Sequence, residues 1–216
     1  MHRLECEKTL LNKFSLIAGL DEAGRGPLAG PLVAASVAIG RDTIINTGNL
    51  AEVNDSKKLS PRRREGLFEL LTTEIAEIGI GICDHITVDR INVLQATFLA
   101  MSKAVSAHRA RPQFLLVDGN KTIPNFDIQQ RAEIGGDARV FLIAAASIIA
   151  KVTRDRLMME YHELYPEYGF DQHKGYGTKL HMENLDKYGP CPIHRVSFAP
   201  VKKKPAKKGC LLGRIK

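Results

Sequence analysis

The sequence contains no tryptophan and only four cysteines in 216 residues. The cysteines (Cys6, Cys83, Cys191 and Cys210) follow no pairing rhythm, which argues against a disulfide framework and indicates a reducing compartment. Cys191 and His194 form a C-x-x-H pair without a second pair at matching spacing. Zinc sites of this kind need four ligands, so an ordinary loop is the favoured interpretation of the pair.

Long hydrophobic runs are also missing. The longest, residues 141–150, is too short to cross a bilayer and stops at Lys151. The first residues, MHRLECEKTLLNKF, mix both charge signs and lack the apolar centre of a signal peptide. We therefore expect a cytoplasmic protein without a membrane partner.

Acidic residues are absent from the C-terminal segment 201–216, which carries seven basic ones. That segment therefore accounts for the whole net charge of +7, since residues 1–200 hold 24 basic and 24 acidic residues. The pattern predicts one folded domain over 1–200 and a basic, flexible tail over 201–216 that attracts polyanions. The charge of the folded part gives only weak support to nucleic-acid binding.

Hydrophobic periodicity predicts a chain that begins with two strands and then alternates strands with helices. Ser60 followed by Pro61 is typical of a helix start. The expected strands are 14–20, 32–39, 77–83, 114–117 and 128–134, and the other expected helices are 91–107, 138–165 and 179–187. This order predicts an α/β fold, with a mixed sheet and helices on its faces.

Acidic residues follow or end several predicted strands. Asp21 and Glu22 end the first strand, and Asp118 ends the apolar run FLLV. Asp137 follows two glycines just before the long helix. If the first and fourth strands are neighbours, Asp21 and Asp118 meet at one edge of the sheet. Such a set of carboxylates suits two hard divalent cations about 4 Å apart, which would activate water against a phosphodiester.

Each acid also has an ordinary structural explanation. Asp-Gly after a strand is a frequent turn signal, and Asp137 is suited to cap the long helix. Neighbouring residues of a straight strand point to opposite faces, so Asp21 and Glu22 can share a metal only if the chain bends there. Gly24 and Gly26 would permit such a bend.

Familiar nucleotide motifs are not matched. The segment GRGPLAG does not have the G-x-G-x-x-G spacing and lies between two strands, and DGNKT is not a phosphate-binding loop. The glycine-rich segment GFDQHKGYGT carries His173, Lys174 and Tyr176, which suit a phosphate contact and stacking on a sugar or base. Taken alone, these residues equally suit an ordinary polar loop.

Six segments, in order, resemble the type 2 ribonucleases H, the ribonuclease HII family. They are LDEAGRGPLAGP, DSKKLSPRRRE, LLVDGN, GGDARVFLIAAASIIAKVTRDR, HKGYGT and HRVSFAPV, and together they span about 16–201. The resemblance implies a ribonuclease H-like mixed five-stranded sheet flanked by helices, with a helical C-terminal portion. It also implies an endonuclease, dependent on Mg²⁺ or Mn²⁺, that hydrolyses the RNA strand of RNA–DNA hybrids. Single ribonucleotides in duplex DNA would be cut on their 5′ side, leaving 3′-hydroxyl and 5′-phosphate ends.

The resemblance also assigns roles to residues. The family's metal-binding and catalytic carboxylates correspond to Asp21, Glu22, Asp118 and Asp137. Asp155 competes for the last position, but inside the long helix it is placed to pair with Lys151, four residues earlier. One ion, bridged by Asp21 and Asp118, would activate the attacking water, and a second would stabilise the leaving 3′-oxygen.

Substrate-binding roles follow from the same resemblance. Gly24, Arg25 and Gly26 would approach the ribose 2′-hydroxyl, which distinguishes RNA from DNA. Tyr176 would stack on the next deoxyribose, and Lys57 and Lys174 would contact phosphates. We expect a monomer. A nucleic-acid-binding module without catalysis and an integrase-like nuclease remain as alternatives, although neither needs both the acid cluster and the Gly-Arg-Gly segment.

Overall fold

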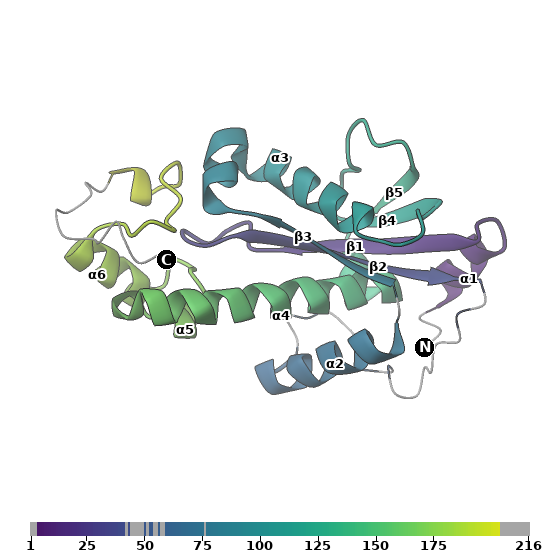
Figure 1. The fold of residues 1–216 in the computed structure, drawn as a ribbon, viewed down its shortest axis with the longest axis horizontal. Helices are drawn as coiled ribbons and strands as arrows, with labels where there is room; N and C mark the ends of the chain where they lie inside the picture. The colour runs from purple at the N-terminus through teal and green to yellow at the C-terminus, as the bar shows by residue number, and fades with distance from the viewer. Residues whose placement is uncertain are drawn as a thin grey trace.

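The computed structural model describes residues 4–41, 43, 50, 52–53, 56, 59–75 and 77–203 (Figure 1). Five strands and six α-helices form the main elements of these parts of the chain. In chain order, with short 3₁₀ turns marked η, they are α1 (Glu5–Leu11), β1 (Leu16–Ala23), β2 (Leu32–Gly40), α2 (Pro61–Glu74), β3 (Glu77–Cys83), α3 (His85–Ser106), β4 (Phe114–Asp118), β5 (Gln129–Glu133), η2 (Gly136–Ala138), α4 (Phe141–Leu164), η3 (Pro166–Tyr168), α5 (Phe170–His173), α6 (Lys179–Tyr188) and η4 (Val201–Lys203).

The strands form one mixed sheet in the order β3-β2-β1-β4-β5. β1, β2 and β3 pair antiparallel, whereas β4 is parallel to both β1 and β5. Helix α3 covers one face, α4 and α2 cover the other, and α5 and α6 lie beyond one end of the sheet (Figure 1). The predicted α/β fold with a mixed five-stranded sheet is confirmed.

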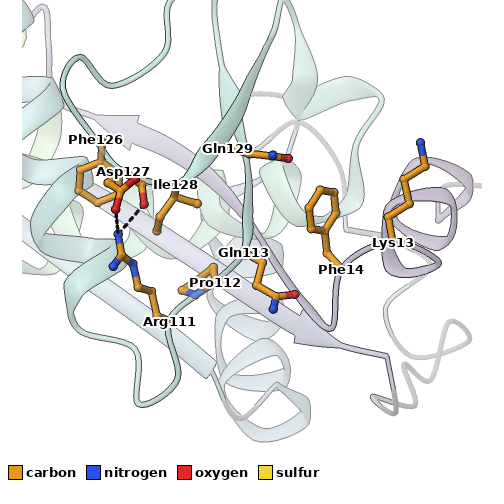
Figure 2. Close-up of a pocket in the computed structure, with 9 residues that line it drawn as sticks. All are labelled: Lys13, Phe14, Arg111, Pro112, Gln113, Phe126, Asp127, Ile128 and Gln129. Atoms are coloured by element: carbon orange, nitrogen blue, oxygen red, sulfur yellow. Dashed lines mark hydrogen bonds and ion pairs between the residues drawn. The ribbon is translucent and has the colours of Figure 1, made fainter.

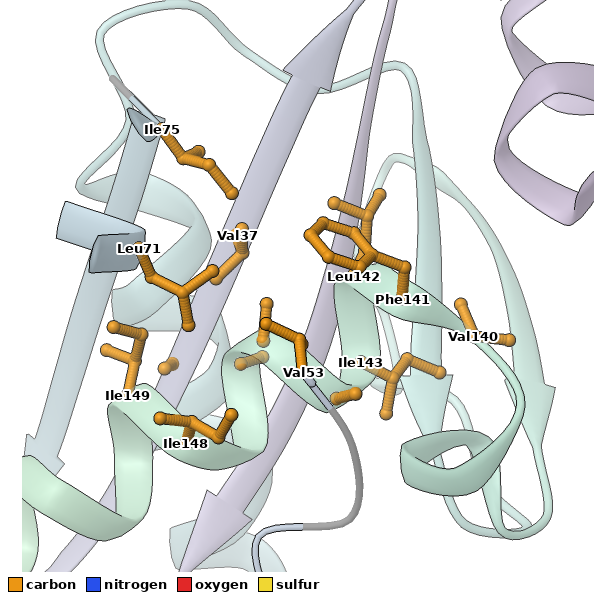
Figure 3. Close-up of a cluster of buried hydrophobic side chains, with 14 of the residues drawn as sticks. Val37, Val53, Leu71, Ile75, Val140, Phe141, Leu142, Ile143, Ile148 and Ile149 are labelled. Atoms are coloured by element: carbon orange, nitrogen blue, oxygen red, sulfur yellow. The ribbon is translucent and has the colours of Figure 1, made fainter. Parts of the chain in front are cut away.

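The main hydrophobic core lies between the sheet and α4. Residues 141–150 are buried without a break, because this part of α4 has the sheet on one side and α2 on another. Figure 3 shows side chains of α4 interleaved with Val37 of β2 and Leu71 of α2. Each such Leu or Val contributes about 1.5–3 kcal/mol of burial free energy, so this layer fixes α4 against β1.

Two helices differ from their expected limits. The expected helix 91–107 begins six residues earlier, at His85, with Asp84 accepting a hydrogen bond from Thr87 N at 2.7 Å. Asn92 has a positive φ of 65° inside this helix, and the resulting kink interrupts the hydrophobic period. The long helix begins at Phe141 rather than 138, because residues 136–138 form a 3₁₀ turn.

The C-terminal portion contacts the connection between β1 and β2. Leu28 N donates to Gly175 O at 2.8 Å, Gly30 N donates to Ile193 O at 2.9 Å, and Arg195 N donates to Leu28 O at 2.8 Å. The expected helical C-terminal portion is thus present and is hydrogen-bonded to the segment that follows the first strand. Residues 204–216 lie outside the described residues, so the flexible tail remains a prediction.

Among the described helices, none combines the length and the apolar character that crossing a membrane requires.

Candidate active site

The ends of β1 and β4 bring two carboxylates together. These strands run parallel with Leu20 opposite Val117, so Asp21 and Asp118 follow at the same edge of the sheet. The edge lies at the carboxyl ends of parallel strands, where α/β proteins build their sites. The conditional prediction that the first and fourth strands are neighbours is confirmed.

Asp21 is buried, with an exposed fraction of 5 %. Its Oδ1 accepts a hydrogen bond from Glu22 N at 2.7 Å, and its carboxylate also bonds to Ser147. Burial raises the pKa of Asp21 well above its usual value, and the charges of Glu22 and Asp118 raise it further. Negative charge therefore gathers at a place where water stabilises it poorly.

Asp118 is held by the turn that precedes α4. Its Oδ1 accepts a hydrogen bond from Gly136 N at 2.8 Å. A side chain at Gly136 would collide with Ile143, since a Cβ there would lie 2.5 Å from Ile143 Cδ1. Asp137, the next residue, is buried in this turn beside Asp118 but does not line the cleft described below.

Glu22 extends toward the other face of the sheet. It accepts a hydrogen bond from Arg25 Nη1 at 3.2 Å and borders a small hollow lined by Leu94, Phe98 and Met101 of α3. β1 stays paired with β2 as far as Ala23, opposite Val33. The strand therefore does not bend at this point, yet Glu22 lines the cleft that holds Asp21 as well as the hollow beside α3, so both carboxylates border one site without a bend.

A cleft of about 240 Å³ joins most of the predicted site residues. Tyr176 forms part of its wall and is 43 % exposed. Its ring lies 5.8 Å from Lys151 Nζ and 5.7 Å from the guanidinium carbon of Arg154. The cleft is lined by Asp21, Glu22, Ala23, Gly24, Arg25, Gly26, Ser56, Asp118, Ser147, Lys151 and Tyr176.

Lys174, one of the two predicted phosphate-binding lysines, is not brought to this cleft. The ammonium of Lys174 bonds to Asp171 O and lies 3.4 Å from Met159 Sδ, outside the cleft lining. Lys57 lies outside the described residues, so its role stays a prediction. Asp155 pairs with Lys151 at 2.7 Å, as expected of an acid on the helix surface.

Three polar residues of the lining were not identified from the sequence as parts of the site. Ser147 and Lys151 lie one turn apart on α4, and Ser56 Oγ lies 2.8 Å from Ser147 Oγ. Ser147 is the polar exception in the apolar run 141–150, and this was the available signal. Its four-residue spacing from Lys151 places both on one face of the helix.

The carboxylates of the cleft are the candidate metal ligands. Within the described ranges, no three Asp, Glu, His or Cys side chains are arranged to hold a metal ion as they stand. The chemistry of the donors does fit, because carboxylate oxygens suit Mg²⁺ and Mn²⁺ and a cation would offset the crowding around Asp21. Asp21, Glu22 and Asp118 thus fit such an ion by charge and ligand type.

A larger cleft, of about 680 Å³, lies near the starts of β4 and β5 (Figure 2). Its charged side chains are Lys13, Arg111 and Asp127, and the last two form an exposed ion pair at 3.6 Å. It contains no cluster of carboxylates. Its lining therefore does not provide the group of candidate metal-binding carboxylates that the smaller cleft contains.

Comparison with known proteins identifies the family. The sequence model for ribonuclease HII matches residues 18–201. The chain belongs to the ribonuclease HII family. A ribonuclease HII from Endomicrobium trichonymphae is 48 % identical over 196 residues, which cover 90 % of this chain and 91 % of that protein. Membership in this family makes the protein an endonuclease that hydrolyses phosphodiester bonds.

Solved structures agree with this assignment. The ribonuclease H2 from Pyrococcus horikoshii OT3 has a TM-score of 0.71 and 31 % identity, covering 87 % of this chain and 96 % of that one. A Bst-RNase HIII crystallised with Mn²⁺ has a TM-score of 0.68 over 89 % of this chain and 70 % of that one. At 18 % identity, the second comparison supports the ribonuclease H-like fold alone.

Proposed function

We propose that this ribonuclease HII family member is a divalent-metal-dependent endonuclease for the RNA strand of RNA–DNA hybrids. It cuts on the 5′ side of single ribonucleotides in duplex DNA and leaves 3′-hydroxyl and 5′-phosphate ends. One observation carries the proposal: a single cleft joins Asp21 and Asp118 to the Gly24–Gly26 segment and Tyr176. Hydrolytic groups and groups suited to sugar recognition thus share one site.

The proposed metal ligands are Asp21, Glu22 and Asp118, with Asp137 as the fourth. Bound Mg²⁺ or Mn²⁺, as two ions, would supply Lewis acidity to the attacking water and to the leaving 3′-oxygen. Hydrogen bonds already orient two of these carboxylates. Ser147 bonds to the carboxylate of Asp21, and the backbone N–H of Gly136 donates to that of Asp118. The Mn²⁺ complex of a protein with the same fold is consistent with such a site.

Recognition of the ribonucleotide is assigned to Gly24, Arg25 and Gly26. The absence of side chains on both glycines lets backbone groups approach the sugar. The half-exposed ring of Tyr176 is suited to stack on the following deoxyribose, and two cations near it keep it in place. Lys151, one of these cations, lies in the same cleft and suits a phosphate contact.

The test is cleavage of duplex DNA that carries one internal ribonucleotide. We expect a cut 5′ to that ribonucleotide with Mg²⁺ or Mn²⁺, a 3′-hydroxyl end, and no cut with a chelator. An integrase-like enzyme would also cut the all-DNA duplex. If the protein cuts neither this duplex nor a long hybrid, it would be a nucleic-acid-binding module without catalysis.

The matched variants are Asp21→Asn and Asp155→Asn. Asp21→Asn should lower kcat by about 100-fold or more, because metal ions contribute several kcal/mol to charge stabilisation. It should also raise the thermal midpoint of the chelated protein by about 2–4 °C, since it removes one of three crowded charges. Asp155→Asn removes the ion pairs with Lys151 and Arg64 but leaves every proposed metal ligand in place, so it should keep most activity. Full activity of Asp21→Asn would contradict the assignment.

A further inference from the structure

The segment after β1 is held by a fully buried arginine from the far end of the chain. Arg195 has an exposed fraction of 0 %. Its Nη2 donates to Gly24 O at 2.7 Å and its Nη1 donates to Arg25 O at 3.1 Å. Nε and Nη2 also donate to Gly30 O, at 3.1 and 2.9 Å. One side chain thus bonds to both ends of the Gly24–Gly30 segment.

This use of a buried arginine is uncommon. A buried guanidinium normally pairs with a carboxylate, because removing the charge from water is costly. No described carboxylate forms a salt bridge with Arg195, and within the described residues its hydrogen-bond acceptors are backbone carbonyls. Anchoring a chain end would not require four such bonds to one loop.

The bonds to Arg195 fix which way two peptide groups face. In a trans peptide the carbonyl and the following N–H point in opposite directions. Because the carbonyls of Gly24 and Arg25 face Arg195, the N–H groups of Arg25 and Gly26 face away from it. Gly24 to Gly26 line the cleft, whereas Arg195 does not, and neither N–H donates a hydrogen bond to another described residue. Two free donors are therefore directed away from the protein interior.

A second buried arginine supports the remainder of the segment. Arg154 Nε donates to Pro31 O at 2.9 Å and its Nη2 donates to Ala29 O at 3.3 Å. It also leaves no room for a side chain at Gly24, whose Cβ would lie 2.2 Å from Arg154 Nε. Arg154 donates a hydrogen bond to neither Gly24 O nor Arg25 O, so the orientation of these two peptide groups depends on Arg195.

We propose that Arg195 is a positioning residue for ribose recognition: it turns the Arg25 and Gly26 amides toward the substrate sugar, and substrate choice depends on it. The inference rests on the proposed function and deepens it. Arg195 itself stays behind the loop and acts through the peptide groups that it holds.

The experiment compares how well each variant distinguishes RNA from DNA. The Asp21→Asn protein serves as the parent, so that the substrate stays intact. Dissociation constants are measured for a DNA duplex with one ribonucleotide and for the all-deoxy duplex of the same sequence. The ratio of the two constants isolates the contribution of the 2′-hydroxyl, because every other contact is shared.

We expect the parent to bind the ribonucleotide duplex about tenfold or more tightly than the deoxy duplex. Arg195→Gln should lower this ratio to about threefold or less. Arg195→Lys keeps the positive charge but has fewer hydrogen-bond donors, so its ratio should lie between those of the parent and Arg195→Gln. The control is Arg156→Gln, which removes the exposed ion pairs between Arg156 on α4 and Glu65 and Glu69 on α2 and should leave the ratio unchanged. Thermal unfolding is recorded for each protein.

The outcomes separate the two proposals. A parent that neither discriminates nor, with Asp21 restored, cuts the ribonucleotide duplex would contradict the proposed function. A discriminating parent whose ratio survives in Arg195→Gln or Arg195→Lys would overturn the positioning role. Failure of both Arg195 variants to fold would also overturn it, because Arg195 would then serve the whole structure rather than the loop.

Discussion

At the scale of single residues, an unusual feature is a group of buried histidines behind the cleft. His173 and His181 stack with ring centroids 4.4 Å apart, and His181 Nε2 lies 3.0 Å from His194 Nε2. His194 Nδ1 is also 3.0 Å from Cys191 Sγ. The Cys191–His194 pair lies in a loop, as predicted, but this loop is buried in a packed cluster, which the sequence spacing alone did not indicate.

Acid should destabilise the protein through these histidines. Burial lowers the pKa of His194 to about 3 and that of His181 to about 4, and it also lowers the pKa of His173. Below the ordinary histidine pKa, the unfolded chain therefore binds protons that the folded chain does not bind. The free energy of unfolding should be constant above the ordinary pKa of 6.5 and fall as the pH drops from there toward 4.

Urea unfolding at pH 7.5, 6 and 5 measures this slope. His181→Gln removes one protonation site and keeps a polar end group, so its slope should be smaller by about 1.4 kcal/mol per pH unit. Comparing the two proteins cancels the groups that they share, including Asp21, whose raised pKa acts in the opposite direction. Equal slopes in both proteins would show that His181 does not carry the effect.

At the scale of elements, glycines set the distance between β3 and α3. A Cβ on Gly81 would lie 1.9 Å from Ala100 O, and one on Gly79 would lie 1.9 Å from Ala104 O. The strand backbone therefore packs directly against the helix backbone. This contact holds α3, whose Leu94, Phe98 and Met101 line the hollow beside Glu22.

Gly81→Ala should lower the free energy of unfolding by about 1–3 kcal/mol or more, because the clash is with backbone that cannot rotate away. Gly66→Ala is the matched control. Gly66 lies inside α2 with no atom near its missing Cβ, so alanine there should stabilise the helix by about 0.5–1 kcal/mol. Denaturant unfolding of both variants checks the pair. A neutral Gly81→Ala would mean that α3 moves away without cost.

The elements were largely predictable, because each carries a local signal. Ser60 caps α2 as expected, accepting from Arg63 N, and β3 has the predicted limits. The start of α3 was missed because the positive φ of Asn92 divides the helix, which puts the two halves of its hydrophobic pattern out of phase. Kinks of this kind depend on tertiary packing and leave little trace in the period of the sequence.

The site was predictable where residues are consecutive and less so where distant segments meet. Asp21, Glu22 and Asp118 follow from strand ends, and Tyr176 from the resemblance to ribonuclease HII. The bonds from Arg195 to Gly24 and Gly30 join residues more than 160 positions apart, and no local pattern records them. A buried arginine in HRVSF looks the same in sequence as an exposed one.

At the scale of the whole molecule, charge is divided between a neutral body and a basic end. Residues 201–216 hold seven basic residues and no acidic ones, whereas the rest of the chain is balanced. Val201 is buried with Leu28 and Leu185, so the end of the described chain packs on the segment that follows β1.

A variant that ends at Lys203 tests what this charge does. It removes five basic residues, Lys204, Lys207, Lys208, Arg214 and Lys216, and keeps Val201 in place. We expect an unchanged thermal midpoint and weaker binding of duplex DNA at low salt. The slope of log K against log salt should become shallower by up to about 4.5, since each of the five residues that neutralises a phosphate contributes about 0.9. The measurement uses Asp21→Asn protein so that the duplex stays intact.

A full-length variant with the five residues replaced by glutamine should reproduce the loss, because the effect depends on charge rather than on chain length. If both variants keep the salt slope of the parent, the tail takes no part in binding, and affinity rests on the cleft alone.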